Sequence, residues 1–140
     1  MANNKAPLTE ADLLKMSEDD YMNDAQLAFF RELLTQQKEE LLANAAKTSE
    51  HLSETPNVPD PADRATIEEE YALELRTRDR ERKLLKKVEA AIQRIDSKEY
   101  GWCEETGEPI GVARLLARPT ATLCLEAQQR RELKQKMFGD

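Results

Sequence analysis

Two cysteines are the residues of this sequence whose type and spacing come closest to a metal site. Cys103 and Cys124 each open a segment like half of a zinc-binding CxxC pair, but Thr106 and Ala127 stand where the second thiols belong. Structural zinc is held by four cysteine or histidine ligands in a tetrahedron, and the single histidine, His51, lies far away in the sequence. We therefore favour two reduced thiols packed in a small apolar module over a tight zinc site or a disulfide between them.

Two acids flank a proline at a predicted helix start. Asp60 precedes Pro61, and Asp63 follows it within one turn. Acids at this position cap free N–H groups and complement the helix dipole, which is one sufficient explanation for them. The alternative is that a long hairpin carries these carboxylates into a narrow place, where they contact a metal or a basic element of a partner.

A basic run follows on the same predicted helix. Seven basic residues against two acids, Asp79 and Glu81, leave a local charge of +5 inside an acidic protein. The basic residues are Arg76, Arg78, Arg80, Arg82, Lys83, Lys86 and Lys87. Such a run is ordinarily a solvated helix face with weak intrahelical ion pairs. The excess of positive charge also fits docking on an acidic protein surface or binding of phosphate.

The sequence carries no pattern that indicates an enzyme. It has no nucleophile elbow, no GxxxxGK phosphate loop, and no histidine near either cysteine. The net charge of −7 argues against a protein that coats nucleic acid through phosphate neutralisation. No apolar run approaches the roughly 18 residues of a membrane span, and the N-terminus does not resemble a signal peptide. We expect a cytoplasmic, non-enzymatic protein without membrane or direct DNA contact.

The elements that must position these residues are helical. Of 140 residues, 35% are charged and only four are glycine, which is typical of long helices. Residues 1–22 form an N-terminal arm with a short helical piece near 9–16. Asn23 caps the next helix with Gln26 completing a capping box, and a 3-4-7 stripe marks its buried face. That stripe consists of Leu27, Phe30, Leu34 and Leu41.

Prolines at 56, 59 and 61 end this helix, and a second one opens at Asp60-Pro61. Its predicted buried side is formed by Ile67, Tyr71, Leu75, Leu85, Val88, Ile92 and Ile95. Helices of about 30 and 36 residues would reach about 45 and 54 Å. Two such helices joined by a short proline-rich turn indicate an antiparallel coiled-coil hairpin over 23–99 with its tip at 55–65.

The remaining chain changes character after residue 100. We expect a small globular module over residues 100–123. A C-terminal segment, 124–140, follows it, and we expect a final helix over about 123–137. The module's expected core is Trp102, Ile110, Leu115, Leu116 and Leu123. The predicted fold is therefore mainly α: a long antiparallel coiled-coil hairpin, a small zinc-finger-like module and a C-terminal helix.

Several long segments make the sequence resemble the DksA/TraR family of bacterial RNA polymerase regulators. The resemblance covers about 21–138 and is most specific at 21–34, 60–65, 68–92 and 100–124. It implies a factor that binds RNA polymerase directly and inserts its coiled coil into the secondary channel. The implied effect is destabilised open complexes, with ribosomal RNA promoters inhibited and some amino-acid biosynthesis promoters activated. The alarmone ppGpp strengthens this effect in the stringent response.

The resemblance also implies roles for individual residues. Asp60, Asp63 and Ala65 match the functional coiled-coil tip, and Arg80 matches a residue that docks on the polymerase rim. Lys87 and Arg118 match two members of the ppGpp contact set, for which cationic side chains are physically required.

The sequence departs from the family at two places. At a further ppGpp position, where the best-known members have lysine, it has Gln128, which predicts a weaker site. Of the four zinc-binding cysteines, Thr106 and Ala127 replace two, as in family members that fold without zinc. We therefore expect no required cofactor, ppGpp as an effector, and a monomer that covers for a zinc-dependent relative when zinc is scarce.

Other functions remain as alternatives. A Gre-like factor would deliver metal at its tip and stimulate transcript cleavage. A coiled-coil adaptor would have no polymerase activity, and a DNA-binding zinc finger is disfavoured by the acidic charge and the missing ligands.

Overall fold

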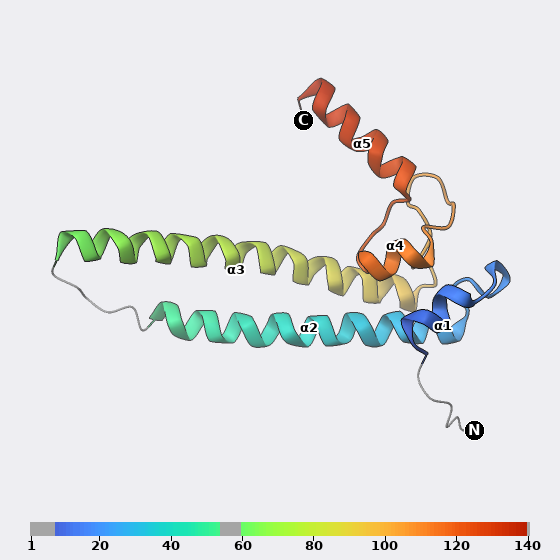
Figure 1. Cartoon of the computed structure of the whole chain (residues 1–140), viewed down its shortest axis with the longest axis horizontal. Coiled ribbons are helices and arrows are strands. Elements are labelled where there is room, and N and C mark those ends of the chain that lie inside the picture. Colours follow the sequence, from blue (N-terminus) through green and yellow to red (C-terminus); the bar gives the residue numbers. More distant parts are fainter. Residues whose placement is uncertain (1–7, 54–59, 140) are drawn as a thin grey trace.

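The computed structural model describes residues 8–53 and 60–139 of the chain, with side chains omitted at 48–53. The described chain is helical, and its only β feature is an isolated antiparallel bridge between Trp102 and Pro109. The helices are α1 (Glu10–Lys15), the 3-10 helix η1 (Glu18–Asp20), α2 (Asp24–Ser53), α3 (Pro61–Asp96), α4 (Val112–Ala117) and α5 (Leu125–Phe138). The predicted mainly α fold is confirmed (Figure 1).

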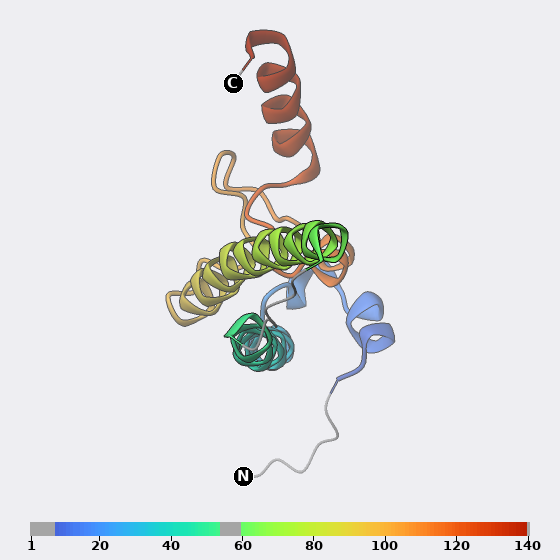
Figure 2. The same cartoon turned by 90° about the vertical axis from the view of Figure 1, so that its left-hand side faces the viewer.

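Helices α2 and α3 form the long antiparallel hairpin, with 30 and 36 residues respectively (Figures 1 and 2). The predicted stripe of α2 is buried at Leu27, Phe30, Leu34 and Leu41, and α3 buries Val88, Ala91 and Ile95. The predicted burial of Tyr71 and Leu75 was wrong, because these side chains are 40% and 42% exposed. The cause is that α3 extends beyond the end of α2, so its outer residues have less helix to pack against (Figure 1).

The helix starts follow the predicted capping chemistry with one change. The Asn23 side chain accepts a hydrogen bond from the Gln26 N–H at 2.9 Å. The Gln26 side chain, however, accepts from the Met22 N–H at 2.9 Å rather than from the cap residue itself. Gln26 is only 1% exposed, so this bond satisfies its carbonyl inside the core. These bonds therefore join the end of the arm, at the buried Met22, to the first turn of α2.

The small module follows the end of α3, which lies at Asp96, before the predicted boundary at 99. Its core contains Ile110, Leu115 and Leu123 as expected, together with the large buried side chain of Tyr100. Trp102 was wrongly placed in this core: it is 37% exposed, with its ring edge-on to Tyr21 at 5.3 Å. The short helix α4, which the sequence pattern did not indicate, supplies Leu115 to the core.

The N-terminal arm from residue 8 onward is bound to the module. Helix α1 lies beside α4 and buries Leu13 (Figure 2). The Tyr21 hydroxyl donates to the Gly101 carbonyl at 2.6 Å and accepts from the Gly111 N–H at 2.8 Å. A Cβ on Gly101 would lie 2.6 Å from Met22 Cγ, so only glycine permits this close approach. Arm and module therefore form one packed unit at the base of the hairpin.

Helix α5 leaves the module and projects away from the hairpin (Figure 1). Ala127 anchors its first turn in the core, whereas Leu133, Met137 and Phe138 are exposed. Among the described residues, no helix has the length and hydropathy that a membrane span requires.

Candidate functional site

The start of α3 carries the acids predicted at the hairpin tip. Asp60 is its N-cap, and its carboxylate accepts a hydrogen bond from the Ala62 N–H at 2.9 Å. Pro61 occupies the first turn, as expected for a residue without an N–H. Asp63 lies in the same turn, and both Asp63 and Ala65 are exposed. The predicted tip also includes residues 55–59, which lie outside the described residues.

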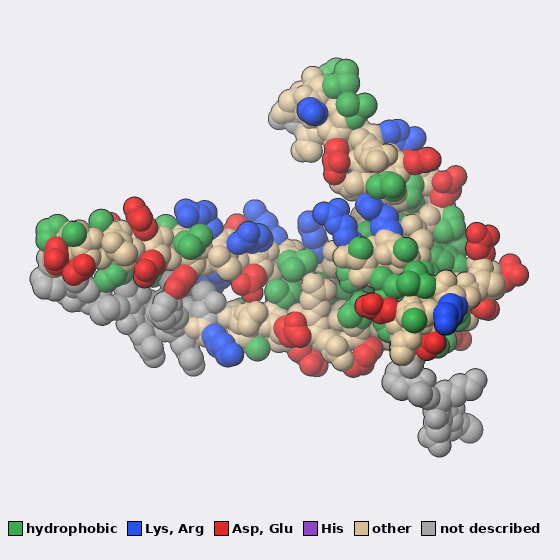
Figure 3. Space-filling model, viewed as in Figure 1, with side chains coloured by type: hydrophobic (Ala, Val, Ile, Leu, Met, Phe, Trp, Pro, Cys, Tyr) green, Lys and Arg blue, Asp and Glu red, His purple; other side chains and the backbone are tan. Residues whose placement is uncertain are grey.

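A basic stripe runs along α3 toward the module. Arg76, Arg80, Lys83 and Lys87 are exposed and recur at spacings of four, three and four residues, which places them on one side of the helix. Lys and Arg side chains gather along the edge of α3 that faces α5 (Figure 3). Asp79 pairs with Arg82 at 2.9 Å and with Lys83 at 3.3 Å. Hydrogen bonds from Arg82 and then Lys83 lower the pKa of Asp79, so this acid stays ionised.

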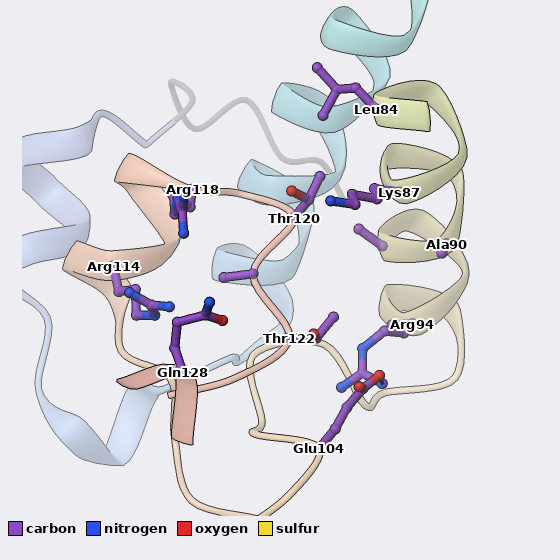
Figure 4. A pocket seen from close by; sticks show the side chains of 12 residues that line it. Leu84, Lys87, Ala90, Arg94, Glu104, Arg114, Arg118, Thr120, Thr122 and Gln128 are labelled. Carbon is purple, nitrogen blue, oxygen red and sulfur yellow. Dashed lines mark hydrogen bonds and ion pairs between the residues drawn. The ribbon is translucent and has the colours of Figure 1, made fainter. Parts of the chain in front are cut away.

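A cavity of about 550 Å³ lies where α3, α4 and the start of α5 meet. Lys87 of α3 and Arg118, which follows α4, both line it, so the structure places at one cavity the two cations that the resemblance predicts to contact ppGpp. They lie on opposite sides of the cavity with Thr120 between them (Figure 4). Gln128 also lines it, and its Nε2 donates to Glu132 Oε1 at 2.9 Å.

Three further charged residues line this cavity, and sequence reasoning missed them. Arg94 donates from Nη1 to Glu104 Oε1 at 3.1 Å and from Nη2 to the carbonyls of Glu99 and Trp102 at 3.0 Å each. Arg114 donates from Nε to the Leu123 carbonyl at 3.0 Å. The seven-residue spacing of Lys87 and Arg94, about two helical turns, could have placed Arg94 on the same face of α3 as Lys87. Arg114 could not be found without α4.

The cysteine pair is packed within the module. Cys103 and Cys124 are free thiols and both are buried. The Thr106 hydroxyl lies 3.9 Å from Cys124 Sγ. Burial opposes ionisation of Cys103, but hydrogen bonds from the Thr106 hydroxyl and from the N–H groups of Cys124, Thr106 and Glu105 outweigh it and lower its pKa to about 6.

The side chains at the zinc-finger position do not fit a zinc ion. Ala127, which stands in place of a fourth thiol, is a fully buried methyl group. Within residues 8–53 and 60–139, no cluster of three or more His, Cys, Asp or Glu side chains could hold a metal ion; the side chain of His51 lies outside the described set. Two thiols, a hydroxyl and a methyl group do not supply the tetrahedral set that structural zinc needs. The turn is instead closed by the Cys103 N–H, which donates to Glu108 O at 2.8 Å, and the Gly107 N–H, which donates to Cys103 O at 2.9 Å.

Comparison with known families matches both parts of the chain. Residues 26–95 match the N-terminal domain of the DnaK suppressor protein DksA, and residues 98–133 match the prokaryotic dksA/traR C4-type zinc finger. The second match therefore covers a segment that has only two cysteines, Cys103 and Cys124, where a C4-type finger has four.

Individual relatives extend the similarity over nearly the whole chain. The RNA polymerase-binding transcription factor DksA of Caulobacter vibrioides is 51% identical over 135 residues, which is 95% of each chain. The protein of the same name from Escherichia coli K12 is 46% identical and covers 86% of this chain and 81% of its own. The structure of transcription factor DksA2 from Pseudomonas aeruginosa superposes with a TM-score of 0.82 at 45% identity, covering 91% of this chain and 99% of that one.

Proposed function

Because the chain belongs to the DksA/TraR family, we propose that it is a transcription factor that binds RNA polymerase directly. The observation that carries this proposal is the joint arrangement of an acidic helix start at one end of α3 and a cationic cavity at the other. In this proposal the factor regulates by occupying a channel of the polymerase rather than by catalysis. The relatives are named transcription factors, which agrees with a non-enzymatic protein.

The hairpin enters the secondary channel with its acidic end first. Helix α3 has 36 residues, which corresponds to about 54 Å at about 1.5 Å per residue. Asp63 and Ala65 reach the neighbourhood of the polymerase active site, while Asp60 also holds the helix end as its cap. Their presence there destabilises the open complex, inhibiting ribosomal RNA promoters and activating some amino-acid biosynthesis promoters.

The basic stripe and the cavity handle docking and regulation. Arg80 docks on an acidic rim of the channel. Its guanidinium is exposed and donates only a long hydrogen bond, from Nη2 to Thr77 Oγ1 at 3.4 Å, so it can exchange this bond for paired hydrogen bonds with a carboxylate. The alarmone ppGpp binds between factor and polymerase with its phosphates on Lys87 and Arg118. Gln128 contributes an amide in place of a cation, which weakens this site and lowers the ppGpp response.

The protein works as a monomer and without zinc. The backbone hydrogen bonds around Cys103 and the Thr106 hydroxyl beside the thiols support independence from zinc, because they close the turn that a metal would otherwise hold. Such a factor can replace a zinc-dependent relative when zinc is scarce.

The direct test is binding to purified bacterial core polymerase, measured with a fluorescently labelled chain and competed with unlabelled wild type. Saturable binding that Arg80→Ala weakens supports the proposal, and the absence of binding overturns it. A transcript-cleavage assay on backtracked polymerase separates the Gre-like alternative, because little or no cleavage is expected here. A coiled-coil adaptor would instead tolerate Asp63→Asn without any change in initiation.

A further inference from the structure

We propose that the groove between the N-terminal arm and the module docks a basic, apolar segment of RNA polymerase, an inference that rests on the function proposed above. This arm–module groove is a hollow of about 450 Å³ whose lining includes Leu14, Met16, Glu18, Trp102, Pro109 and Val112. It is separate from the basic stripe of α3 and from the cavity of Lys87 and Arg118.

The groove exposes large apolar side chains around one hollow. Leu14 is 57% exposed and Trp102, the single tryptophan of the chain, is 37% exposed. Single exposed apolar residues are ordinary, but a group of them around a concavity is typical of an interaction site. Tryptophan in such a position frequently supplies a large part of the binding energy at protein interfaces.

The groove is preformed, because the arm and the module that form its two walls are held together by core packing and by hydrogen bonds. Below Leu14, Leu13 is 1% exposed and packs in the core. The Tyr21 hydroxyl bonds to Gly101 and Gly111, and the Tyr21 ring meets Trp102 edge-on at an interplanar angle of 88°. A partner therefore does not have to order the arm before it binds, which removes one entropic cost of association.

The charge around the groove selects the partner's chemistry. Residues 8–22 carry five acids against the single base Lys15. The acids are Glu10, Asp12, Glu18, Asp19 and Asp20. Of these acids, Glu18 lines the groove itself, and the other four lie near it in the sequence of the arm. An apolar lining that carries this acid complements a segment in which lysine or arginine flanks apolar side chains. The stripe on α3 has the opposite charge and requires an acidic partner surface, so the two surfaces together orient the factor.

The place of the groove in the fold points to the polymerase as the source of that segment. The groove lies at the base of the hairpin, beside α1 and α4, and far from the start of α3 (Figure 1). When the acidic end of the hairpin lies inside the channel, this base stays at its mouth. A surface that borders the mouth is then the part of the polymerase that meets the groove.

The test compares Leu14→Glu with Leu133→Glu, an exposed leucine of α5 with the same 57% exposure. The thermal unfolding midpoint of each variant is first compared with that of wild type, to show that both fold. Their affinities for core polymerase are then measured without ppGpp. We expect Leu14→Glu to bind about 10-fold more weakly, the loss for one buried leucine at an interface, and Leu133→Glu to bind like wild type. Wild-type affinity of Leu14→Glu, or an equal loss in both variants, would overturn the inference.

A second readout uses Trp102 itself. Replacing it with 5-hydroxytryptophan gives a fluorophore that can be excited apart from the tryptophans of polymerase, and acrylamide quenching reports its exposure. Polymerase should protect this fluorophore, and unchanged quenching in a demonstrated complex contradicts the inference alone. If wild type does not bind polymerase at all, the proposed function fails and the inference with it. If the fluorophore becomes protected from acrylamide when the concentration of this protein alone is raised, without polymerase, the partner is a second copy of the chain and the inference is overturned.

Discussion

Lys87 on α3 and Arg118 after α4 line one cavity, although they belong to different parts of the fold. The hairpin supplies one cation and the module supplies the other, so the distance between them depends on how the module sits on α3. Arg94 holds that junction, because it bonds to Glu104 and to two carbonyls of the segment that follows α3. An anion in this cavity would therefore join the two parts.

Substitution of Lys87 tests the cavity as the ppGpp site. Lys87→Ala should raise the ppGpp concentration for half-maximal effect about 10-fold, because a charge-assisted hydrogen bond contributes about 1.5 kcal/mol. The effect on initiation without ppGpp should remain. In vitro transcription from a ribosomal RNA promoter over a ppGpp titration measures both quantities.

Lys83→Ala is the matched control, since Lys83 lies one turn away, outside the cavity, and pairs with Asp79. Gln128→Lys should shift the titration in the opposite direction by adding a cation to the cavity wall. Loss of all activity in Lys87→Ala without ppGpp would show that this lysine does not belong to a nucleotide site.

The long elements could be predicted from sequence because their signals are local. The apolar stripe around Phe30, the three prolines after 55 and the cap at Asp60 depend on neighbouring residues, and they yielded both hairpin helices. Trp102 was placed wrongly because its environment depends on the arm: its ring packs edge-on against Tyr21, which is distant in the sequence, and the residue is not enclosed in the core of the module. Arg114 was missed because α4, with six residues, has too few turns to show a helical period.

Loss of the Tyr21 hydroxyl should loosen the arm from the module. Tyr21→Phe removes a donor to Gly101 and an acceptor for Gly111, and we expect a loss of about 1–3 kcal/mol in the free energy of unfolding. Urea denaturation measures it, with Tyr71→Phe as the exposed control. A loss no larger than in Tyr71→Phe would mean that these bonds do not hold the arm.

Stability should fall at alkaline pH because of Tyr100. Burial, and then the nearby Tyr21, raise the pKa of Tyr100 above its ordinary value, and the neutral phenol donates to the Pro119 carbonyl at 2.7 Å. Its contribution is therefore present below the ordinary tyrosine pKa of about 10 and is lost as pH rises from there toward the folded-state pKa.

Urea denaturation between pH 8 and pH 11 measures this loss, with wild type compared with Tyr100→Phe. We expect the difference between the two proteins to shrink above about pH 10, by up to about 1.4 kcal/mol per pH unit. A constant difference over the whole range would show that the phenol does not titrate differently in the folded state.

Removal of metal should leave the protein folded. The module is closed by backbone bonds around Cys103 and by the Thr106 hydroxyl, with Ala127 in the core. We expect the same Tm before and after chelation, and Cys103→Ser should fold with a loss of about 1–2 kcal/mol, in the range of ordinary single substitutions. Unfolding by the chelator would reveal a zinc site.

The central claim is tested most directly by the lifetime of open complexes at a ribosomal RNA promoter, measured with purified bacterial polymerase after zinc chelation. Wild type should shorten this lifetime, and ppGpp should shorten it further. Asp63→Asn, which keeps the Asp60 cap, should bind polymerase like wild type. It should leave the lifetime of the open complex at the value measured with polymerase alone. Lifetimes that wild type and Asp63→Asn shorten equally would contradict a function carried by the acidic end of the hairpin.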